Sequence, residues 1–264
     1  MPDHVTGFHA EISTRLDALA AEARAGGLDA AIALMSDAIA TGGVIQAFGT
    51  GHSQAFAMEI AGRAGGLIPT NNIRLFDLVL YGSREPADLV GAGMERDPSV
   101  VQELYELYPI HPSDVFIIAS NSGVNGSIVG MALTAKEHGH PVIAVTSLAH
   151  TMAVAPKHPS GKRLSEIADV VIDNHAPYGD TTIELGSGVK AGAVSSITAA
   201  FIAQLLTVGV TDRLAAGGAL PPVYISANIP EGDEHNHALE ARYGNRIKRG
   251  VAPGPDNPWK VGQQ

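Results

Sequence analysis

The chain has 264 residues, a formal net charge of −10 at pH 7 and no cysteine. Its length is sufficient for one large α/β domain with a buried core, whereas the lack of cysteine excludes disulfides and thiolate metal sites. The acidic balance and the 5% aromatic content argue against nucleic acid as a partner, because nucleic-acid binding requires a basic face and stacking rings.

Two amphipathic helices are predicted before the first strand, over about 8–25 and 28–40, and each ends at a pair of glycines. No basic segment followed by an apolar one precedes them, and no continuous apolar run of the chain reaches the length of a membrane span. We therefore expect a cytoplasmic protein without membrane contact. Neither helix carries recognisable chemistry, so we assign residues 1–43 to a helical segment that packs on the main domain or forms dimer contacts.

A polar loop follows the first predicted strand, 44–48, and leads into a helix predicted over about 53–65. The loop reads Gly49-Thr50-Gly51-His52-Ser53-Gln54. It lacks the spacing and the lysine of a Walker loop, and it has no third glycine to complete a dinucleotide fingerprint. The loop is nevertheless a turn of glycine and hydroxyl-bearing residues that joins a strand to a helix.

The stretch that follows this helix is less regular. A short strand is predicted at 67–69 and a helix over about 99–107, but the apolar residues of 71–97 show no clear period. We interpret 71–97 as a wall or lid of a site, or as surface padding.

A second loop of the same type follows the strand predicted at 115–119. It reads Ser120-Asn121-Ser122-Gly123-Val124-Asn125-Gly126, and a helical stripe continues over about 125–138. The unpaired N–H groups and the dipole of such a helix start favour an anion. Asn125 is placed to be the N-cap, and Gly123 can adopt a left-handed backbone and let a ligand approach. Turn and capping preferences of Ser and Asn explain the same composition without a ligand.

Two more strands are predicted at 142–145 and 169–173. The alternation of strands and helices implies a parallel sheet with helices on both faces. Loops at the carboxyl ends of neighbouring parallel strands converge on one crevice. Two serine-bearing loops without a lysine therefore indicate a monophosphate held by hydroxyls and amides.

The last part of the chain is expected to contain one long helix and a tail. Residues 182–186 end the sheet region, and a helix is predicted over about 190–214, almost without charge. Such a helix is buried in the core or against a partner subunit. We assign 44–216 to a single α/β domain and 217–264 to a tail that docks on it.

These motifs resemble the SIS (sugar isomerase) domain family. The second loop is similar to that family's SxSGx[ST] phosphate loop, and Gly51-His52-Ser53 to its first serine-bearing loop. The single-domain branch, kin of phosphoheptose isomerase, is the nearer match over roughly 8–245. That match rests on Met58-Glu59-Ile60, Arg63-Ala64-Gly65-Gly66, Ser226-Ala227-Asn228-Ile229-Pro230 and Gly232-Asp233-Glu234-His235-Asn236. Asn125 departs from the usual Ser or Thr, and Gln54 stands where this branch often carries His.

The resemblance implies a doubly wound, flavodoxin-like α/β fold that binds a phosphorylated sugar at the strand ends. It also implies homodimers or homotetramers in which neighbours complete each other's sites. We expect no cofactor. The residues that would hold the phosphate are Gly51, Ser53, Ser120, Ser122, Gly123 and Asn125.

Aldose–ketose isomerisation needs a base that moves a proton between neighbouring carbons, and a carboxylate serves well. Glu59, on the helix after the first loop, and Glu184, in the segment before the long helix, are the candidates. The resemblance favours Glu59. A solvated helix position explains Glu59 without catalysis, and a polar strand edge explains Glu184.

Ring opening of a cyclic sugar phosphate needs an acid or base near neutral pH, which suits histidine. His235 is our first candidate because it lies in the tail that resembles the family, and His52 in the first loop is the second. An exposed or hydrogen-bonded histidine explains each of them without catalysis. We predict no metal site, because His235 and His237 have no third ligand at a recognisable spacing.

The sequence thus favours a phosphosugar isomerase. A non-catalytic phosphosugar sensor and an amino-sugar-phosphate lyase or etherase remain the alternatives.

Overall fold

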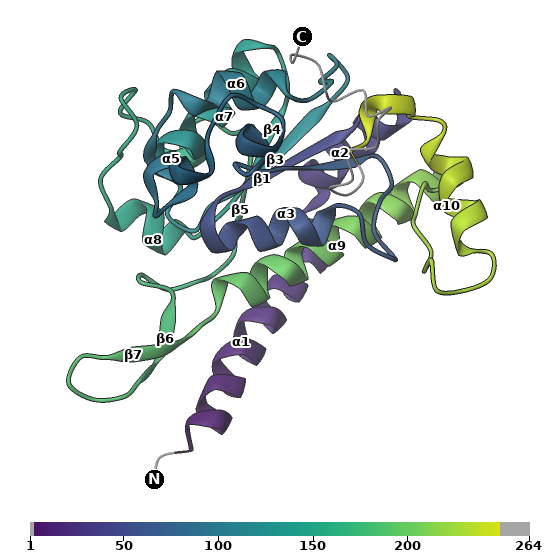
Figure 1. Cartoon of the computed structure of the whole chain (residues 1–264). Coiled ribbons are helices and arrows are strands. Elements are labelled where there is room, and N and C mark those ends of the chain that lie inside the picture. The colour runs from purple at the N-terminus through teal and green to yellow at the C-terminus, as the bar shows by residue number, and fades with distance from the viewer. Residues whose placement is uncertain (1–2, 249–264) are drawn as a thin grey trace.

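The computed structural model describes residues 3–248 and contains a five-stranded sheet with the order β2-β1-β3-β4-β5 (Figure 1). All neighbouring strands of this sheet are parallel. The strands are β1 (Ile45–Gly49), β2 (Thr70–Ile73), β3 (Val115–Ala119), β4 (Val142–Thr146) and β5 (Val170–Asp173). This order is the flavodoxin-like form of the doubly wound fold, which confirms the predicted fold class.

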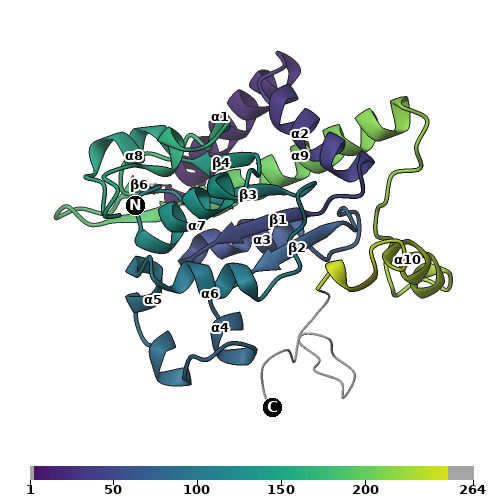
Figure 2. The same ribbon diagram turned by 90° about the horizontal axis from the view of Figure 1, so that it is seen from above.

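Helices cover both faces of the sheet, so that every residue of β1, β3 and β4 is buried. The helices are α1 (His4–Arg24), α2 (Asp29–Ala40), α3 (Gln54–Ile60), α4 (Asp77–Leu80), α5 (Gly93–Arg96), α6 (Val100–Glu106), α7 (Gly126–Glu137), α8 (Leu148–Ala153), α9 (Ser195–Ala216) and α10 (Gly232–Glu240). One core lies between the sheet and α2, α3 and α9, and the other between the sheet and α5, α6 and α7. Figure 2 shows α2 and α9 on one side of the sheet and α6 on the other. Buried parallel strands read as continuous apolar runs, which explains why they were predictable.

Two elements extend away from the sheet on the same side of the molecule: α1 and a hairpin of β6 (Thr181–Glu184) and β7 (Lys190–Ala193) (Figure 1). The prediction of a helix from residue 190 was wrong, because α9 begins at Ser195. The carboxylate of Asp180 accepts hydrogen bonds from the amides of Val194 and Ser195 at 3.2 and 2.8 Å, and from the Ser195 hydroxyl at 2.7 Å. This capping interaction fixes the helix start after β7.

α9 is long and apolar enough, by length and composition, to span a membrane, and it is the one such helix among residues 3–248. Its side chains pack with those of α2 and with the sheet in one core. The core helix of a folded domain has the same properties. We therefore interpret α9 as the central helix of this face.

Two predicted boundaries near the first loop were also wrong. α3 ends at Ile60 rather than near residue 65, because the glycines Gly62 and Gly65 adopt φ values of 76° and 80°. The strand predicted at 67–69 is displaced to β2, and Leu67 instead forms an isolated bridge with Val223 of the tail. Residues 71–97 contain β2 and the short helices α4 and α5.

The described part of the tail docks beside β2. Tyr224 and Leu239 pack on Ile68 in a small third core. The side-chain amide of Asn236 accepts from the backbone N–H of Ile225 at 3.0 Å and donates to its carbonyl at 2.9 Å. The residues that resemble the family's tail thus stabilise this local fold.

Candidate functional site

The strand order reverses between β1 and β3, which lie side by side and both end in polar loops. Gly49 pairs in register with Ala119, so the loops leave the sheet from adjacent positions. In open α/β sheets, ligands bind outside the carboxyl ends of the strands at such a switch point. The convergence predicted from the sequence is therefore present.

The first loop is a tight turn into α3. A β-carbon on Gly49 would lie 2.4 Å from the carbonyl oxygen of Ser53, so only glycine fits at this position. Gly51 has a φ of 54°, in the left-handed region. The short 3₁₀ turn Gly51–Ser53 leaves His52 exposed and Ser53 half-buried.

A hydrogen bond to a serine hydroxyl within the second loop stabilises its turn. The backbone N–H of Gly123 donates to the buried Ser120 Oγ at 3.1 Å, and Gly123 has a φ of 63°. Asn125 is the N-cap residue of α7, as predicted, but its side chain makes no capping hydrogen bond. The first N–H groups of α7 have no partner within the helix, so this loop presents several donors at the positive end of a helix dipole.

The two loops share one small polar recess, of about 10 Å³, at the carboxyl edge of the sheet. Its polar lining comprises His52, Ser53, Ser120, Asn121, Asn174, Ser195 and Ser196. Asn174 Nδ2 donates to Asn121 Oδ1 at 3.1 Å, which joins the end of β5 to the second loop. Of the predicted phosphate contacts, Ser53 and Ser120 therefore face the same space. Ser122, Gly123 and Asn125 belong to the same loop as Ser120 but do not line the recess.

Sequence reasoning missed three polar residues of this recess. Asn174 follows the strand β5 directly, so the rule that loops at strand ends meet would have found it. Ser195 and Ser196 open α9, but the predicted helix boundary placed them inside an apolar helix. Because of this error in the helix boundary, neither serine was recognised as a site residue.

Glu59 lies on the part of α3 that faces α9. Its carboxylate accepts a hydrogen bond from Gln204 Nε2 at 2.6 Å and forms an ion pair with Arg63. The Glu59 side chain is 22% exposed. It is not among the residues that line the recess, so the structure does not bring this predicted base to the two loops.

Glu184 and His235 also lie apart from the recess within one chain. Glu184 ends β6 on the projecting hairpin, is exposed, and pairs in register with Lys190. His235 Nε2 lies 3.0 Å from the carbonyl oxygen of Val223, whose bridge with Leu67 is at the amino end of β2. Of the two predicted histidines, His52 lines the recess and His235 does not.

A cluster suited to a metal ion is not formed within the described range. Among residues 3–248 there is no group of three or more His, Asp or Glu that could hold one. His235 and His237 both lie on α10, where residues two positions apart point to different sides of the helix.

A second cavity, of about 200 Å³, lies on the other side of the first loop. Its lining combines that loop with the irregular stretch: Gly49, Thr50, Gly51, Gln54, Leu75, Phe76, Leu89, Gly91, Met94 and Glu95. The stretch 71–97 is thus one wall of a cavity beside the loop. Among the residues that the structure describes, Glu95 is the one carboxylate in this lining, and no periodicity in the sequence pointed to it.

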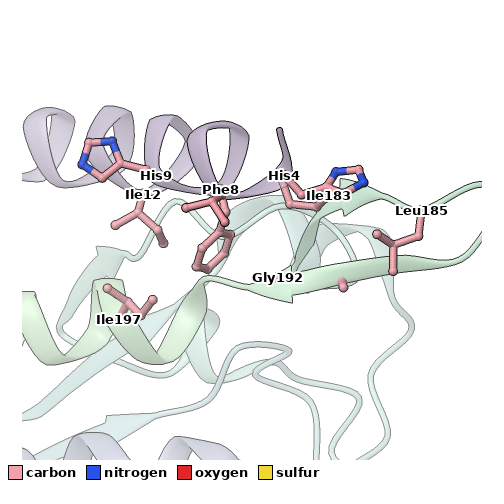
Figure 3. A pocket seen from close by; sticks show the side chains of 10 residues that line it. His4, Phe8, His9, Ile12, Ile183, Leu185, Gly192 and Ile197 are labelled. Carbon is pink, nitrogen blue, oxygen red and sulfur yellow. The ribbon is translucent and has the colours of Figure 1, made fainter. Parts of the chain in front are cut away.

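An apolar groove of about 560 Å³ lies far from both loops, between the start of α1 and the hairpin. Figure 3 shows Phe8, Ile12, Ile183 and Ile197 directed into it. The only nitrogen-bearing side chains in its lining are those of His4 and His9. Its chemistry suits another apolar surface rather than a sugar phosphate.

Comparisons with known proteins agree with this fold. Residues 7–147 match the family described as the SIS domain. UPF0309 proteins of Listeria monocytogenes and Halalkalibacterium halodurans are 38% and 37% identical, over 81% and 80% of this chain and 86% of each relative. The names of these relatives state no reaction.

Solved structures with the same architecture include two phosphoheptose isomerases. The enzyme from Francisella tularensis is 14% identical, with a TM-score of 0.53 over 80% of this chain and 97% of that chain. The enzyme from Neisseria gonorrhoeae is 18% identical, with a TM-score of 0.50 over 79% of this chain and 98% of that chain. Identities this low show the shared fold alone.

Proposed function

This chain belongs to the SIS (sugar isomerase) domain family, and from that premise we propose that it binds a phosphorylated sugar and interconverts its aldose and ketose forms. The observation that carries the proposal is the recess in which Ser53 and Ser120, from two different loops, face the same space. This recess lies where the strand order reverses.

The electrostatics of the recess favour a monophosphate. Among residues 3–248, no lysine or arginine lines the recess, and the chain has a net charge of −10. Attraction for an anion comes instead from hydroxyls, amides and the N-terminus of α7. Ser122, Gly123 and Asn125 complete this set in our proposal, with the amide of Gly51 beside them.

The chemistry requires a proton transfer between two neighbouring carbons through an enediol. His52 lines the recess beside Ser53 and is our candidate for ring opening of a cyclic substrate. The base is a separate question, because Glu59 and Glu184 both lie outside the recess.

The position of these two carboxylates favours one alternative, a non-catalytic phosphosugar sensor. A sensor needs the phosphate recess but no base. An amino-sugar-phosphate lyase or etherase needs the same recess and a base at C2, but it also expels a leaving group from the sugar, which an isomerase does not. Turnover assays separate these alternatives.

We also propose that the chain acts as a homodimer or homotetramer and that a second copy covers the apolar groove of Figure 3. Val5 and Leu185 at this groove are 81% and 52% exposed, and both projecting elements contribute to its lining. A second copy docked there would carry the hairpin, and with it Glu184, towards a neighbouring subunit. Light scattering of the wild type and of Phe8→Glu tests this association: a monomeric wild type contradicts it.

A thermal-shift screen tests the proposed ligand. Terminal sugar phosphates, sugar 1-phosphates and their unphosphorylated parents are compared at equal concentration. A ligand at 100 times its dissociation constant adds about 2.7 kcal/mol of stability, which is readily visible. Stabilisation by sugar phosphates alone supports the proposal, and stabilisation by neutral sugars alone contradicts it. NMR of the best binder then shows whether its C2 proton exchanges with solvent.

A further inference from the structure

Glu95 lies beside the first loop, although it is 45 positions from Thr50 in the chain. The Thr50 hydroxyl donates to its Oε2 at 3.4 Å. A β-carbon on Gly51 would lie 3.1 Å from its Oε1 and 3.5 Å from its Oε2. The carboxylate therefore rests directly against the left-handed glycine of this loop.

The main chain around Glu95 is fixed to the other loop. The Ser127 hydroxyl, in the first turn of α7, donates to the Glu95 carbonyl oxygen at 2.8 Å. A β-carbon on Gly126 would lie 2.1 Å from the Arg96 carbonyl oxygen. Glu95 thus contacts one loop through its side chain and the helix after the other loop through its backbone.

The carboxylate of Glu95 is free to act on a ligand, unlike that of Glu59. Within the described residues its only side-chain hydrogen bond is the long one from Thr50. It is half-buried in the cavity of about 200 Å³, whose other wall residues include Leu75, Phe76 and Met94. A partly desolvated carboxylate beside apolar side chains is the environment that general bases use.

We infer that Glu95 is the base that removes the proton from the carbon next to the carbonyl of the bound sugar phosphate. This inference rests on the proposed function. The phosphate lies at the mouth of the recess beside Ser53 and Ser120, and the carbon chain passes over Gly51, which has no side chain of its own, to the carboxylate of Glu95. The substrates that fit are sugars phosphorylated at the terminus opposite their carbonyl group.

The proposed step conserves atoms and electrons. The carboxylate takes the C2 proton, the electron pair of that C–H bond forms the carbon–carbon double bond, and the carbonyl oxygen takes a proton from a water molecule to give the enediol and hydroxide. The carboxylic acid then returns its proton to C1, and the C2 hydroxyl gives its proton to that hydroxide, which restores the water, as its oxygen becomes the new carbonyl. No oxidant or reductant takes part, and Glu95 ends as the carboxylate with which it began.

The first test compares two isosteric variants of the full chain, Glu95→Gln and Glu106→Gln. Glu106 is an exposed carboxylate on α6 that accepts a hydrogen bond from Gln102, and it serves as the control. Glu95→Gln is expected to lower deuterium exchange at C2 roughly 100-fold or more. The stabilisation by the same sugar phosphate should remain, and Glu106→Gln should exchange at the wild-type rate.

A second variant distinguishes a base from a structural carboxylate. Glu95→Ala leaves space at the cavity wall, so added formate is expected to restore exchange in Glu95→Ala but not in Glu95→Gln. A wild type that exchanges while Glu95→Gln stays within about threefold of it overturns the inference and leaves the proposed isomerase intact. A wild type that binds sugar phosphates without exchange overturns both and favours the sensor, and one that binds none overturns the phosphate recess as well.

Discussion

Two short helices flank the first loop, and each carries a glutamate, but they place it in opposite environments. α3 follows the loop in the chain and packs on the α9 face of the sheet, where Glu59 is held by Arg63 and Gln204. α5 is distant in the chain and belongs to the opposite face, where Glu95 lies against Thr50 and Gly51.

The comparison shows that proximity in sequence to a binding loop is a poor guide to proximity in space. A helix of seven residues leads away from the loop at about 1.5 Å per residue, so Glu59, near its end, is already remote from the loop. A crossover segment that returns to the same edge can place its residues against the loop directly.

Gly126→Ala should have the largest effect, because it disturbs α5 through its contact with α7. The added β-carbon would meet the Arg96 carbonyl oxygen at 2.1 Å, and neither backbone can yield easily. We expect a loss of about 1–3 kcal/mol in unfolding free energy and a roughly 100-fold loss of C2 exchange as the carboxylate of Glu95 shifts.

The control for this variant is Gly93→Ala on α5 itself. A β-carbon there meets no atom within 4 Å, and the φ of Gly93 is not in the left-handed region. Its stability should be unchanged or up to about 1 kcal/mol higher, since alanine favours helix. Equal losses in both variants would show that α5 is sensitive to any substitution and that its contact with α7 does not explain the loss.

Ser120→Ala and Ser122→Ala should affect binding more than turnover of bound substrate. A hydrogen bond to a charged group contributes about 1.5–3 kcal/mol, so affinity for sugar phosphates should fall roughly 10- to 100-fold. Isothermal titration with the phosphorylated sugar and with its neutral parent measures this. Unchanged affinity for the phosphorylated form in both variants would contradict the phosphate assignment of the second loop.

Glu59→Gln should leave catalysis intact and change stability only slightly. Its ion pair with Arg63, whose side chain is 49% exposed, is screened by solvent and contributes at most about 1 kcal/mol. The amide oxygen can still accept from Gln204. A double-mutant cycle with Arg63→Gln, read by chemical denaturation, isolates the pair. If Glu59→Gln instead abolishes C2 exchange, the roles assigned to α3 and α5 must be exchanged.

The sheet and both loops could be predicted because their signals are local. Buried parallel strands are continuous apolar runs, and the glycines and hydroxyls of the loops follow them directly. Ser53 and Ser120 were found in this way, and the structure places both in one recess.

Glu95 could not be predicted, because its position depends on contacts between segments that are far apart in the chain. The stretch 71–97 contains an edge strand and short helices, none long enough to establish a period. The hairpin before α9 was not predicted, for a related reason. Gly186 and Gly188 have φ values of 95° and 76°, and the sequence pattern did not distinguish their turn from a helix start.

Acidification should produce the smallest effect, and it should act on the α5 side of the sheet. His140 is buried and lies near Tyr105 and Phe116, and burial lowers its pKa from the ordinary value of 6.5. The unfolded chain therefore binds a proton at this residue more readily than the folded chain does.

Stability contributed by neutral His140 is complete above pH 6.5 and decreases as the pH falls from 6.5 towards the folded-state pKa. We expect a decrease of a few tenths of a kcal/mol for each half pH unit in that window, measured by urea denaturation between pH 7.5 and 5.5. His140→Gln should flatten this dependence. An equal slope in wild type and His140→Gln would show that other groups dominate. Hydrogen exchange should locate the loss in α6 and α7 before α3, because the His140 ring packs on the α6 side of β3.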